Sequence, residues 1–467
     1  MSTERIRVEV DYDVQVALHE VATSANPLIA LNAFRDNQNL LKDWRIIYAD
    51  EGDWGPFKLR RCQFSEKGIV ATAFRGKSLW ILDIDSVNTD ATMGFLMGTG
   101  TFVDSNAASY IRSLAYRENI SGALLAIGRK LNETFSADEL VRFNPYLYLW
   151  EAQRNWTEKT IKFCRQAVAA LHALSLNLSP LDEEWGGSYR TLHRDRAEAF
   201  ADTLLAEFQE QLNDGLSEGI TEQVELVEAM LVRTKIIEAT SQKSAQHKMD
   251  ELIQFMHDEL STMMLRELIV CADILCRGDQ SALSKKLNSL HDQSDPLAVM
   301  KNGAWDLFIP RAMDYLANTS VEPATDFYLA NLVTFDTDVA DIIRLTELRA
   351  IALHRTSQTA FPFLNEGLID WLEKRLGEKR MLGLAPIFQK DSFDFRTQRR
   401  TVEKIRDVLA EDRLRLLSLL DEAATRRSRQ LLRHELFCTF IPLMPRGLIV
   451  QYFVRINQHD DDHRRAL

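Results

Sequence analysis

The chain has 467 residues, 46% hydrophobic and 27% charged, a balance typical of a globular protein with room for two to four domains. Its formal net charge of -12 excludes nonspecific nucleic-acid binding by the molecule as a whole, so any such surface must be a local basic patch. Five scattered cysteines argue against a disulfide framework and a zinc cluster, and they favour a reducing compartment.

The first hundred residues combine several patterns. Residues 5–14 alternate apolar and polar side chains, which predicts a half-buried strand, and they lack the apolar core of a signal peptide. Residues 58–85 predict antiparallel strands with turns at Lys67-Gly68 and Arg75-Gly76. The motif ATAFRGKS (71–78) fits a relaxed phosphate-loop pattern. However, the strand-like LWILDID after it leaves no room for the helix that such a loop needs, so we expect a hairpin turn.

The next region, GTFVDSNAASYI (100–111), begins as an apolar strand, turns at Asp-Ser-Asn and continues as a helix of small residues. Asp104 therefore lies at the end of a predicted buried strand. A carboxylate there costs free energy unless a metal or another partner compensates its charge. We interpret Asp104 as the first acid of a metal-dependent nuclease site.

Three later segments supply candidate partners. Glu151 lies in the apolar helix of FNPYLYLWEAQRN, Asp306 at a predicted helix start in KNGAWDLFIPRAMDYL, and Asp336 after the predicted strand 327–333, with Asp338 beside it. Each has an ordinary alternative: Glu151 could face solvent on an amphipathic helix, and Asp306 could be a first-turn residue favoured by the helix dipole.

This order of acids resembles that of PIN-domain nucleases: a strand ending in Asp-Ser-Asn, a helix with a glutamate, a helix opening on Asp, and a strand ending in Thr-x-Asp. The resemblance covers about a quarter of the chain, mainly residues 95–158 and 300–345. It implies an α/β fold, a Rossmann-like three-layer PIN-type domain with a central parallel sheet, interrupted by a large, mainly helical insertion and followed by a helical C-terminal region. Asp326 is the alternative third acid, but it immediately precedes the strand, so Asp306 is preferred.

The implied segments are a mixed α+β region (1–98), the two halves of the PIN-like core (99–158 and 296–360), the helical insertion (159–295), and the helical C-terminal region with a polar tail (361–467).

The resemblance also implies the chemistry of the site. Carboxylate oxygens are ligands for Mg²⁺ or Mn²⁺. Asp104, Glu151, Asp306 and Asp336 would be the catalytic acids and metal ligands, with Asp338 as a further ligand. Asn106 and Thr334 would support them, Asn106 by orienting Asp104 or a bound water. The reaction implied is hydrolysis of a phosphodiester in RNA, more often single-stranded than duplex, with DNA left open.

A basic segment from 374 to 434 is the best candidate for holding a polyanion. Its proposed nucleic-acid contacts are Arg396, Arg399, Arg400 and Lys404, near Phe393 and Phe395, on which a base could stack. Because Glu and Asp are mixed through the same helices, a solvated amphipathic surface is the favoured alternative.

We therefore expect a cytoplasmic endoribonuclease, such as a toxin or an antiviral defence effector. The alternative is a noncatalytic helical scaffold or interaction protein with a degenerate PIN-like core. The most apolar C-terminal run (436–454) is broken by two prolines and Arg446, so no membrane association is expected. A regulatory protein partner or a homo-oligomer is compatible with either function.

Overall fold

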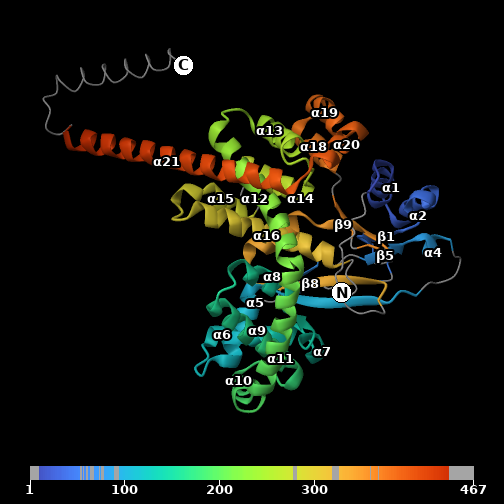
Figure 1. Ribbon diagram of the computed structural model, residues 1–467, viewed down its shortest axis with the longest axis vertical. Helices are drawn as coiled ribbons and strands as arrows, with labels where there is room; N and C mark the ends of the chain where they lie inside the picture. Colours follow the sequence, from blue (N-terminus) through green and yellow to red (C-terminus); the bar gives the residue numbers. More distant parts are fainter. Residues whose placement is uncertain are drawn as a thin grey trace.

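The computed structural model describes residues 10–52, 55, 57–58, 62–63, 68–72, 74, 78–88, 94–276, 281–317, 325–357, 359–365 and 368–440. This part of the chain is a mixed α/β structure, mostly helical, with two five-stranded sheets (Figure 1). The C-terminal run 441–454 and the polar tail lie outside the described residues, as does the first part of the strand predicted at 5–14.

The first sheet is antiparallel throughout, in the order β10-β9-β1-β5-β2. Its strands are β1 (Trp44–Asp50), β2 (Phe57–Lys58), β5 (Ser78–Leu82), β9 (Leu348–His354) and β10 (Ala360–Leu364). Strand β1 is a nearly continuous apolar run and is buried on both faces. Ile46 and Tyr48 pack against the N-terminal helices, whereas Ile47 and Ala49 pack toward Leu329 of the second sheet.

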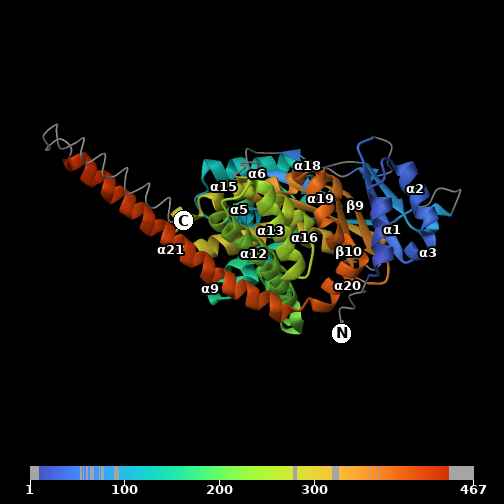
Figure 2. The same cartoon turned by 90° about the horizontal axis from the view of Figure 1, so that it is seen from above.

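The outer face of this sheet is covered by α1 (Tyr12–Ala22), α2 (Pro27–Asp36) and α3 (Gln38–Leu41), as Figure 2 shows. The strand predicted through Val14 is therefore wrong from Tyr12 onward. Asp11 caps α1 by accepting a hydrogen bond from the amide of Asp13. Helical spacing then buries Leu18 and Val21, and this packing overrides the short alternating pattern.

The second sheet is mixed, in the order β3-β4-β8-β6-β7. Its strands are β3 (Cys62–Gln63), β4 (Ile69–Thr72), β6 (Met97–Val103), β7 (Phe143–Asn144) and β8 (Phe327–Thr334). Strand β6 is parallel to both β7 and β8, and β3 and β4 are antiparallel additions. Gly98 and Gly100 are required on β6 because a side chain at either position would overlap the ring of Tyr328.

The predicted hairpin within ATAFRGKS is wrong, because β4 and β5 belong to different sheets. Residues 73 and 75–77 of this motif lie outside the described residues. The segment that follows is the strand β5, as predicted, and the four-residue helix α4 (Ile84–Val87) comes only after it. The first hundred residues thus contribute strands to both sheets and pair there with segments from 327 to 364.

The predicted helical region between the two halves of the core is confirmed. The helices from the second sheet to the end of this region are α5 (Ser105–Tyr116), α6 (Gly122–Thr134), α7 (Ala137–Leu140), α8 (Tyr146–Ala152), α9 (Glu158–Leu176), α10 (Glu183–Ser188), α11 (Arg194–Gln211), α12 (Ser217–Thr240), α13 (Ala245–Asp258), α14 (Leu265–Leu275) and α15 (Ala282–Asn288). Short 3-10 or π segments adjoin several of them, including η1 (Gln153–Asn155) after α8.

The later helices are α16 (Pro296–Leu316), α17 (Thr337–Leu345), α18 (Leu368–Leu376), α19 (Glu378–Leu384), α20 (Lys390–Arg399) and α21 (Val402–Phe440). The first half of α21 packs on α12 through the ion pairs Arg233–Asp412, Arg413–Glu228 and Arg406–Glu225. Its second half extends beyond the rest of the molecule (Figure 2). No helix in the described residues has both the length and the apolar character needed to cross a membrane.

Candidate active site at the ends of two parallel strands

Asp104 follows the last residue of β6 and caps the N-terminus of α5. Its Oδ1 accepts a hydrogen bond of 2.6 Å from the amide of Ala107, and its Oδ2 accepts bonds from the Thr334 hydroxyl at 2.6 Å and the Phe335 amide at 3.3 Å. The side chain is buried. Burial, together with a smaller effect of the charge of Glu151, raises the pKa of Asp104 to about 7, against the lowering effect of the bonds from Ala107 and Thr334.

Thr334, the last residue of β8, links two of the predicted acids. It is fully buried. While its hydroxyl donates to Asp104, the same oxygen accepts a bond of 2.9 Å from the amide of Asp336. Asp336 in turn caps α17 by accepting 2.8 Å from the amide of Asp338. The predicted supporting residue Thr334 therefore positions the ends of both parallel strands relative to each other.

Glu151 lies on α8, beside β6 and α5. Its side chain is half-buried, so it does not point freely to solvent. Burial raises its pKa, a hydrogen bond from Ser105 and the charge of Arg154 lower it, and the charge of Asp336 raises it. The charge of Glu151 in turn raises the pKa values of Asp104 and Asp306, so these acids are close enough for their charges to interact.

Asp306 reaches the same place from a different position than predicted. The sequence placed it at a helix start, which is wrong: α16 begins at Pro296, with Asp295 as its cap, and Asp306 lies in the middle of the helix. Pro296 at the first helical position supplies the start signal that was overlooked. Burial raises the pKa of Asp306 well above its usual value, and the charges of Asp336 and Asp338 raise it further.

The acids thus follow the ends of β6 and β8 or lie on α8, α16 and α17; α8 contacts β6, and α16 contacts both β8 and α17. They act on one another's ionisation and include no sulfur or imidazole donor, a set that fits a hard cation such as Mg²⁺ or Mn²⁺. In the described part of the chain, no three acidic, histidine or cysteine side chains lie in an arrangement that would hold a metal ion as it stands. The oxygen donors thus suit Mg²⁺ or Mn²⁺, but the carboxylates would have to move closer together when the cation binds.

A basic residue that sequence reasoning missed lies on the α17 side of these acids. The ammonium of Lys286, on α15, lies 3.6 Å from the carboxylate of Asp338. Its charge lowers the pKa of Asp338, which burial and the charge of Asp336 raise, and it also lowers the pKa of Asp306. The predicted helical insertion therefore supplies a cation to the acids. No local motif marks this lysine, because α15 and α17 meet only in the folded chain.

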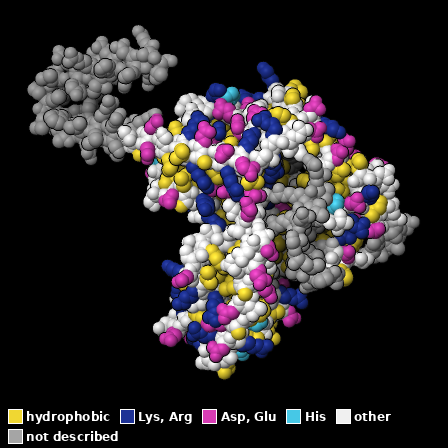
Figure 3. Space-filling model, viewed as in Figure 1, with side chains coloured by type: hydrophobic (Ala, Val, Ile, Leu, Met, Phe, Trp, Pro, Cys, Tyr) yellow, Lys and Arg dark blue, Asp and Glu magenta, His cyan; other side chains and the backbone are white. Residues whose placement is uncertain are grey.

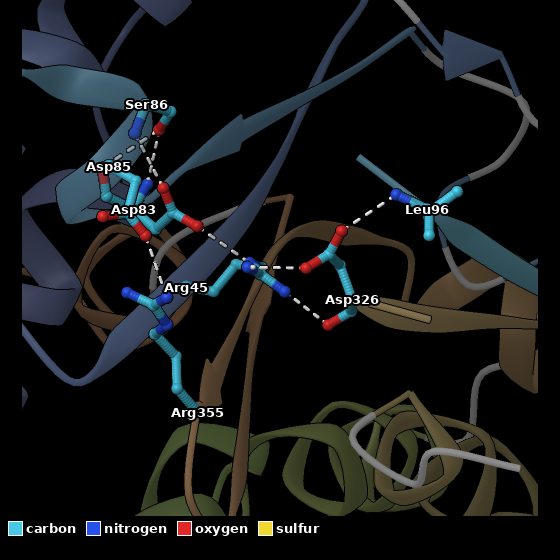
Figure 4. Close-up of polar contacts among 7 residues, drawn as sticks. All are labelled: Arg45, Asp83, Asp85, Ser86, Leu96, Asp326 and Arg355. Atoms are coloured by element: carbon cyan, nitrogen blue, oxygen red, sulfur yellow. Dashed lines mark hydrogen bonds and ion pairs between the residues drawn. The ribbon is translucent and has the colours of Figure 1, made fainter. Parts of the chain in front are cut away.

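The alternative third acid, Asp326, lies away from the cluster. It precedes β8, whereas Asp336 follows it, and eight extended residues separate their positions by about 26 Å. Figure 4 shows that Asp326 pairs with Arg45 and that its Oδ2 accepts 2.9 Å from the amide of Leu96. Arg45 also bonds the buried Asp83 at 3.0 Å, so this cluster joins the two sheets.

Asn106 lies at the second position of α5 and is half-buried. The hydrogen bonds described for Asp104 come from Ala107, Thr334 and Phe335, and Asn106 is not among these donors. The described bonds that orient Asp104 therefore come from Thr334 and two backbone amides, and the other role predicted for Asn106, orienting a bound water, stays a prediction.

The predicted nucleic-acid contacts of the basic segment are largely used within the protein. Arg396 is buried, so its assignment to nucleic acid is wrong: its guanidinium donates 2.6 Å to the carbonyl of Ile387 and lies against His257. Lys404 donates 2.8 Å to the carbonyl of Asp258. Arg399 is exposed and stacks on Phe395, with its guanidinium carbon 4.7 Å from the ring centre.

Arg400 is also exposed, and it lines a small pocket with Glu222 and Glu225. Figure 1 places α20 with α13, α18 and α19, well above α5 and α8. The basic segment is therefore not beside the acids. An anionic substrate bound at the acids needs cations from another part of the chain.

Beside Glu151 there is an open pocket of about 440 Å³ formed by α5, α8, η1, α9 and α16. Its basic residues are Arg154 and Lys301, and its neutral polar residues include Ser105, Thr160 and Asn302. Sequence reasoning missed this pocket because one of its walls comes from α16, more than a hundred residues along the chain from the helices that form the others.

Comparison of the chain with models of known families, with curated proteins and with solved structures gave no match. A functional assignment therefore depends on the site itself.

Proposed function

We propose that the chain is a metal-dependent nuclease of the PIN-like type that hydrolyses phosphodiester bonds, with single-stranded RNA as its preferred substrate. The observation that carries this proposal is the meeting of acids from four separate segments at the carboxyl ends of the parallel strands β6 and β8. The carboxyl edge of such a sheet is where open α/β folds bind their ligands.

The electrostatics support the same proposal. Burial and mutual repulsion raise the pKa values of Asp104, Glu151 and Asp306, so ionising all of these acids together costs free energy that a bound cation would offset. Asp104, Glu151, Asp306 and Asp336 would hold Mg²⁺ or Mn²⁺, with Asp338 as a further ligand. When bound, the cation supplies an activated water and stabilises charge on the phosphate.

The chain's own groups have distinct parts in this scheme. Thr334 holds the carboxylate of Asp104 and the backbone of Asp336 in fixed relation, which sets the separation of two ligands before substrate arrives. Lys286 offsets part of the negative charge on the α17 side. The three hydrogen bonds to Asp104 leave its carboxylate oriented in one rotamer.

The test is cleavage of an end-labelled single-stranded RNA by the full chain, with Mg²⁺, with Mn²⁺ and with a chelator. We expect cutting that depends on the metal and is lost in Asp336→Asn and Asp306→Asn. Asp138→Asn is the matched control, because Asp138 is an exposed aspartate on α7. Cutting that survives both site variants would refute the assignment of these acids.

The second candidate function is a noncatalytic scaffold. It is favoured by the long helix α21, whose second half extends beyond the body, and by the absence, among described residues, of three acids already arranged around a metal position. Calorimetry with Mg²⁺ and Mn²⁺ separates the two: the scaffold predicts no metal binding and no cutting by the wild-type chain.

A further inference from the structure

The pocket beside Glu151 is lined by two cations, Arg154 and Lys301. Lys301 and Asn302 enter it from α16, Arg154 from η1 and Thr160 from α9, while Ser105 at the start of α5 connects it to Asp104. Its volume of about 440 Å³ lies within the range of small-ligand sites, and it is open to solvent on one side.

Arg154 is held in a defined orientation at this pocket. One terminal nitrogen donates 3.0 Å to Oδ1 of Asn302, and the guanidinium lies 5.5 Å from the ring centre of Trp305. Its Nε is buried and has no hydrogen-bond partner among the described residues. A guanidinium fixed by packing, with donors left over, is suited to a phosphate group.

Lys301 is exposed on the same wall, and the part of the chain that the structure describes gives it no hydrogen bond or ion pair. A flexible ammonium beside an ordered guanidinium can follow a phosphate without fixing its exact position. Together they place two positive charges in the pocket that Glu151 also lines, where an approaching polyanion would otherwise meet the charge of the acid.

Among the described residues, the face shown in Figure 3 offers no broad basic surface as an alternative. Basic and acidic side chains are interspersed over the face shown in Figure 3, and the chain carries a formal net charge of -12. A nucleic-acid strand must therefore be held by a few local cations close to the reacting phosphate.

We propose that this pocket binds a backbone phosphate of the single-stranded nucleic acid, namely the phosphate next along the strand from the phosphodiester that is cut. The inference rests on the proposed nuclease function, since it takes the acids as the reaction centre. The phosphodiester backbone is common to RNA and DNA, so the pocket itself would accept either strand, and the experiment compares the two.

The experiment measures binding of fluorescein-labelled single-stranded RNA and DNA of equal length by anisotropy. The full chain carries Asp336→Asn to prevent turnover, and the titrations are made with Mg²⁺ at several salt concentrations. In this background we expect Lys301→Gln and Arg154→Gln each to weaken binding about fivefold. Each should also reduce the slope of log affinity against log salt by about 0.7, the value for one contact to a single strand.

Two controls keep the result interpretable. Lys379→Gln removes an exposed lysine on α19, far from α8 in Figure 1, and should leave affinity and salt slope unchanged. Arg154→Lys keeps the charge and should recover part of the affinity that Arg154→Gln loses. Circular dichroism establishes that each variant is folded, and Lys301→Gln, at an exposed position, carries the test if Arg154→Gln does not fold.

The outcomes separate the pocket from the nuclease. If the wild type cuts RNA and both charge variants bind it as well as before, phosphate binding in the pocket is refuted and the nuclease assignment stands. If the variants bind more weakly but the wild type shows no metal-dependent cutting, phosphate binding in the pocket is supported and the nuclease assignment is refuted. If neither strand binds at micromolar protein, or if an acidic peptide binds in preference to both, the proposal that the pocket binds a nucleic-acid phosphate is refuted.

Discussion

The hydroxyl of Thr334 donates a hydrogen bond of 2.6 Å to Oδ2 of Asp104, across 230 residues of sequence. Both residues end parallel strands, and the same Thr334 oxygen accepts from the amide of Asp336. One buried hydroxyl thereby connects two of the four acids that we assign to the site. The bond to Oδ2 is strongest when Asp104 is ionised, because hydrogen bonds to a charged carboxylate are stronger than bonds to a neutral acid.

Thr334→Val should therefore lower both stability and activity. Valine keeps the shape but leaves Oδ2 of Asp104 with only the Phe335 amide and leaves the Asp336 amide without its acceptor. We expect a loss of about 1–3 kcal/mol in the free energy of unfolding, measured by urea denaturation, and loss of RNA cleavage. Thr334→Ser retains the hydroxyl and should stay within about 1 kcal/mol of the wild type. Equal effects of valine and serine would contradict this role.

The stability of the metal-free protein should fall as the pH rises from about 4 to about 7. Folded Asp104, with its pKa raised to about 7, keeps its proton in this window, whereas an unfolded aspartic acid has lost it. The folded state then binds more protons, so the free energy of unfolding decreases with pH, by on the order of 4 kcal/mol from Asp104 alone. Thermal unfolding across this range tests the trend.

Millimolar Mg²⁺ should reverse that loss at pH 8, because it binds the ionised acids of the folded chain. In Asp306→Asn the rise in melting temperature on adding Mg²⁺ should be much smaller. A melting temperature indifferent to both pH and Mg²⁺ would mean that the acids do not form a charged cluster.

Lys286→Gln should strengthen Mg²⁺ binding by about three- to tenfold. The ammonium of Lys286 lies 3.6 Å from Asp338 and repels a cation bound among the same acids. Isothermal titration calorimetry measures the change, and Lys285→Gln, an exposed neighbour on α15, is the matched control. Weaker Mg²⁺ binding in Lys286→Gln alone would show that the lysine instead holds the acids together.

Asp326→Asn and Asp306→Asn should behave oppositely in the cleavage assay. Asp326 is tied to Arg45 and the Leu96 amide at the start of β8 (Figure 4), so its neutral variant should cut at a rate within twofold of the wild type. Because Asp326 is partly exposed, its charge should contribute about 1 kcal/mol or less to stability. Asp306→Asn should abolish cutting while the protein stays folded. The reverse pattern would make Asp326 the third acid.

Local patterns in the sequence were sufficient for several features. The apolar runs that end at Asp104 and Thr334 are strands β6 and β8, and the region 159–295 is helical, because period and composition are properties of neighbouring residues. The order of the acids was also visible. The strand expected at 5–14 failed from Tyr12 onward because Asp11 caps a helix, and the residues that this helix buries, such as Leu18 and Val21, lie beyond the short alternating run.

Only the tertiary structure decided which charged residues meet. Asp306 reaches the acids from the middle of α16, and Lys286 reaches them from the insertion. Arg396, which resembles an ordinary surface arginine in the sequence, is buried against a carbonyl. A charged side chain carries no local sign of its burial or partner, since both depend on segments a hundred or more residues away. The sequence by itself therefore determined the elements and the candidate acids, and long-range packing determined the site.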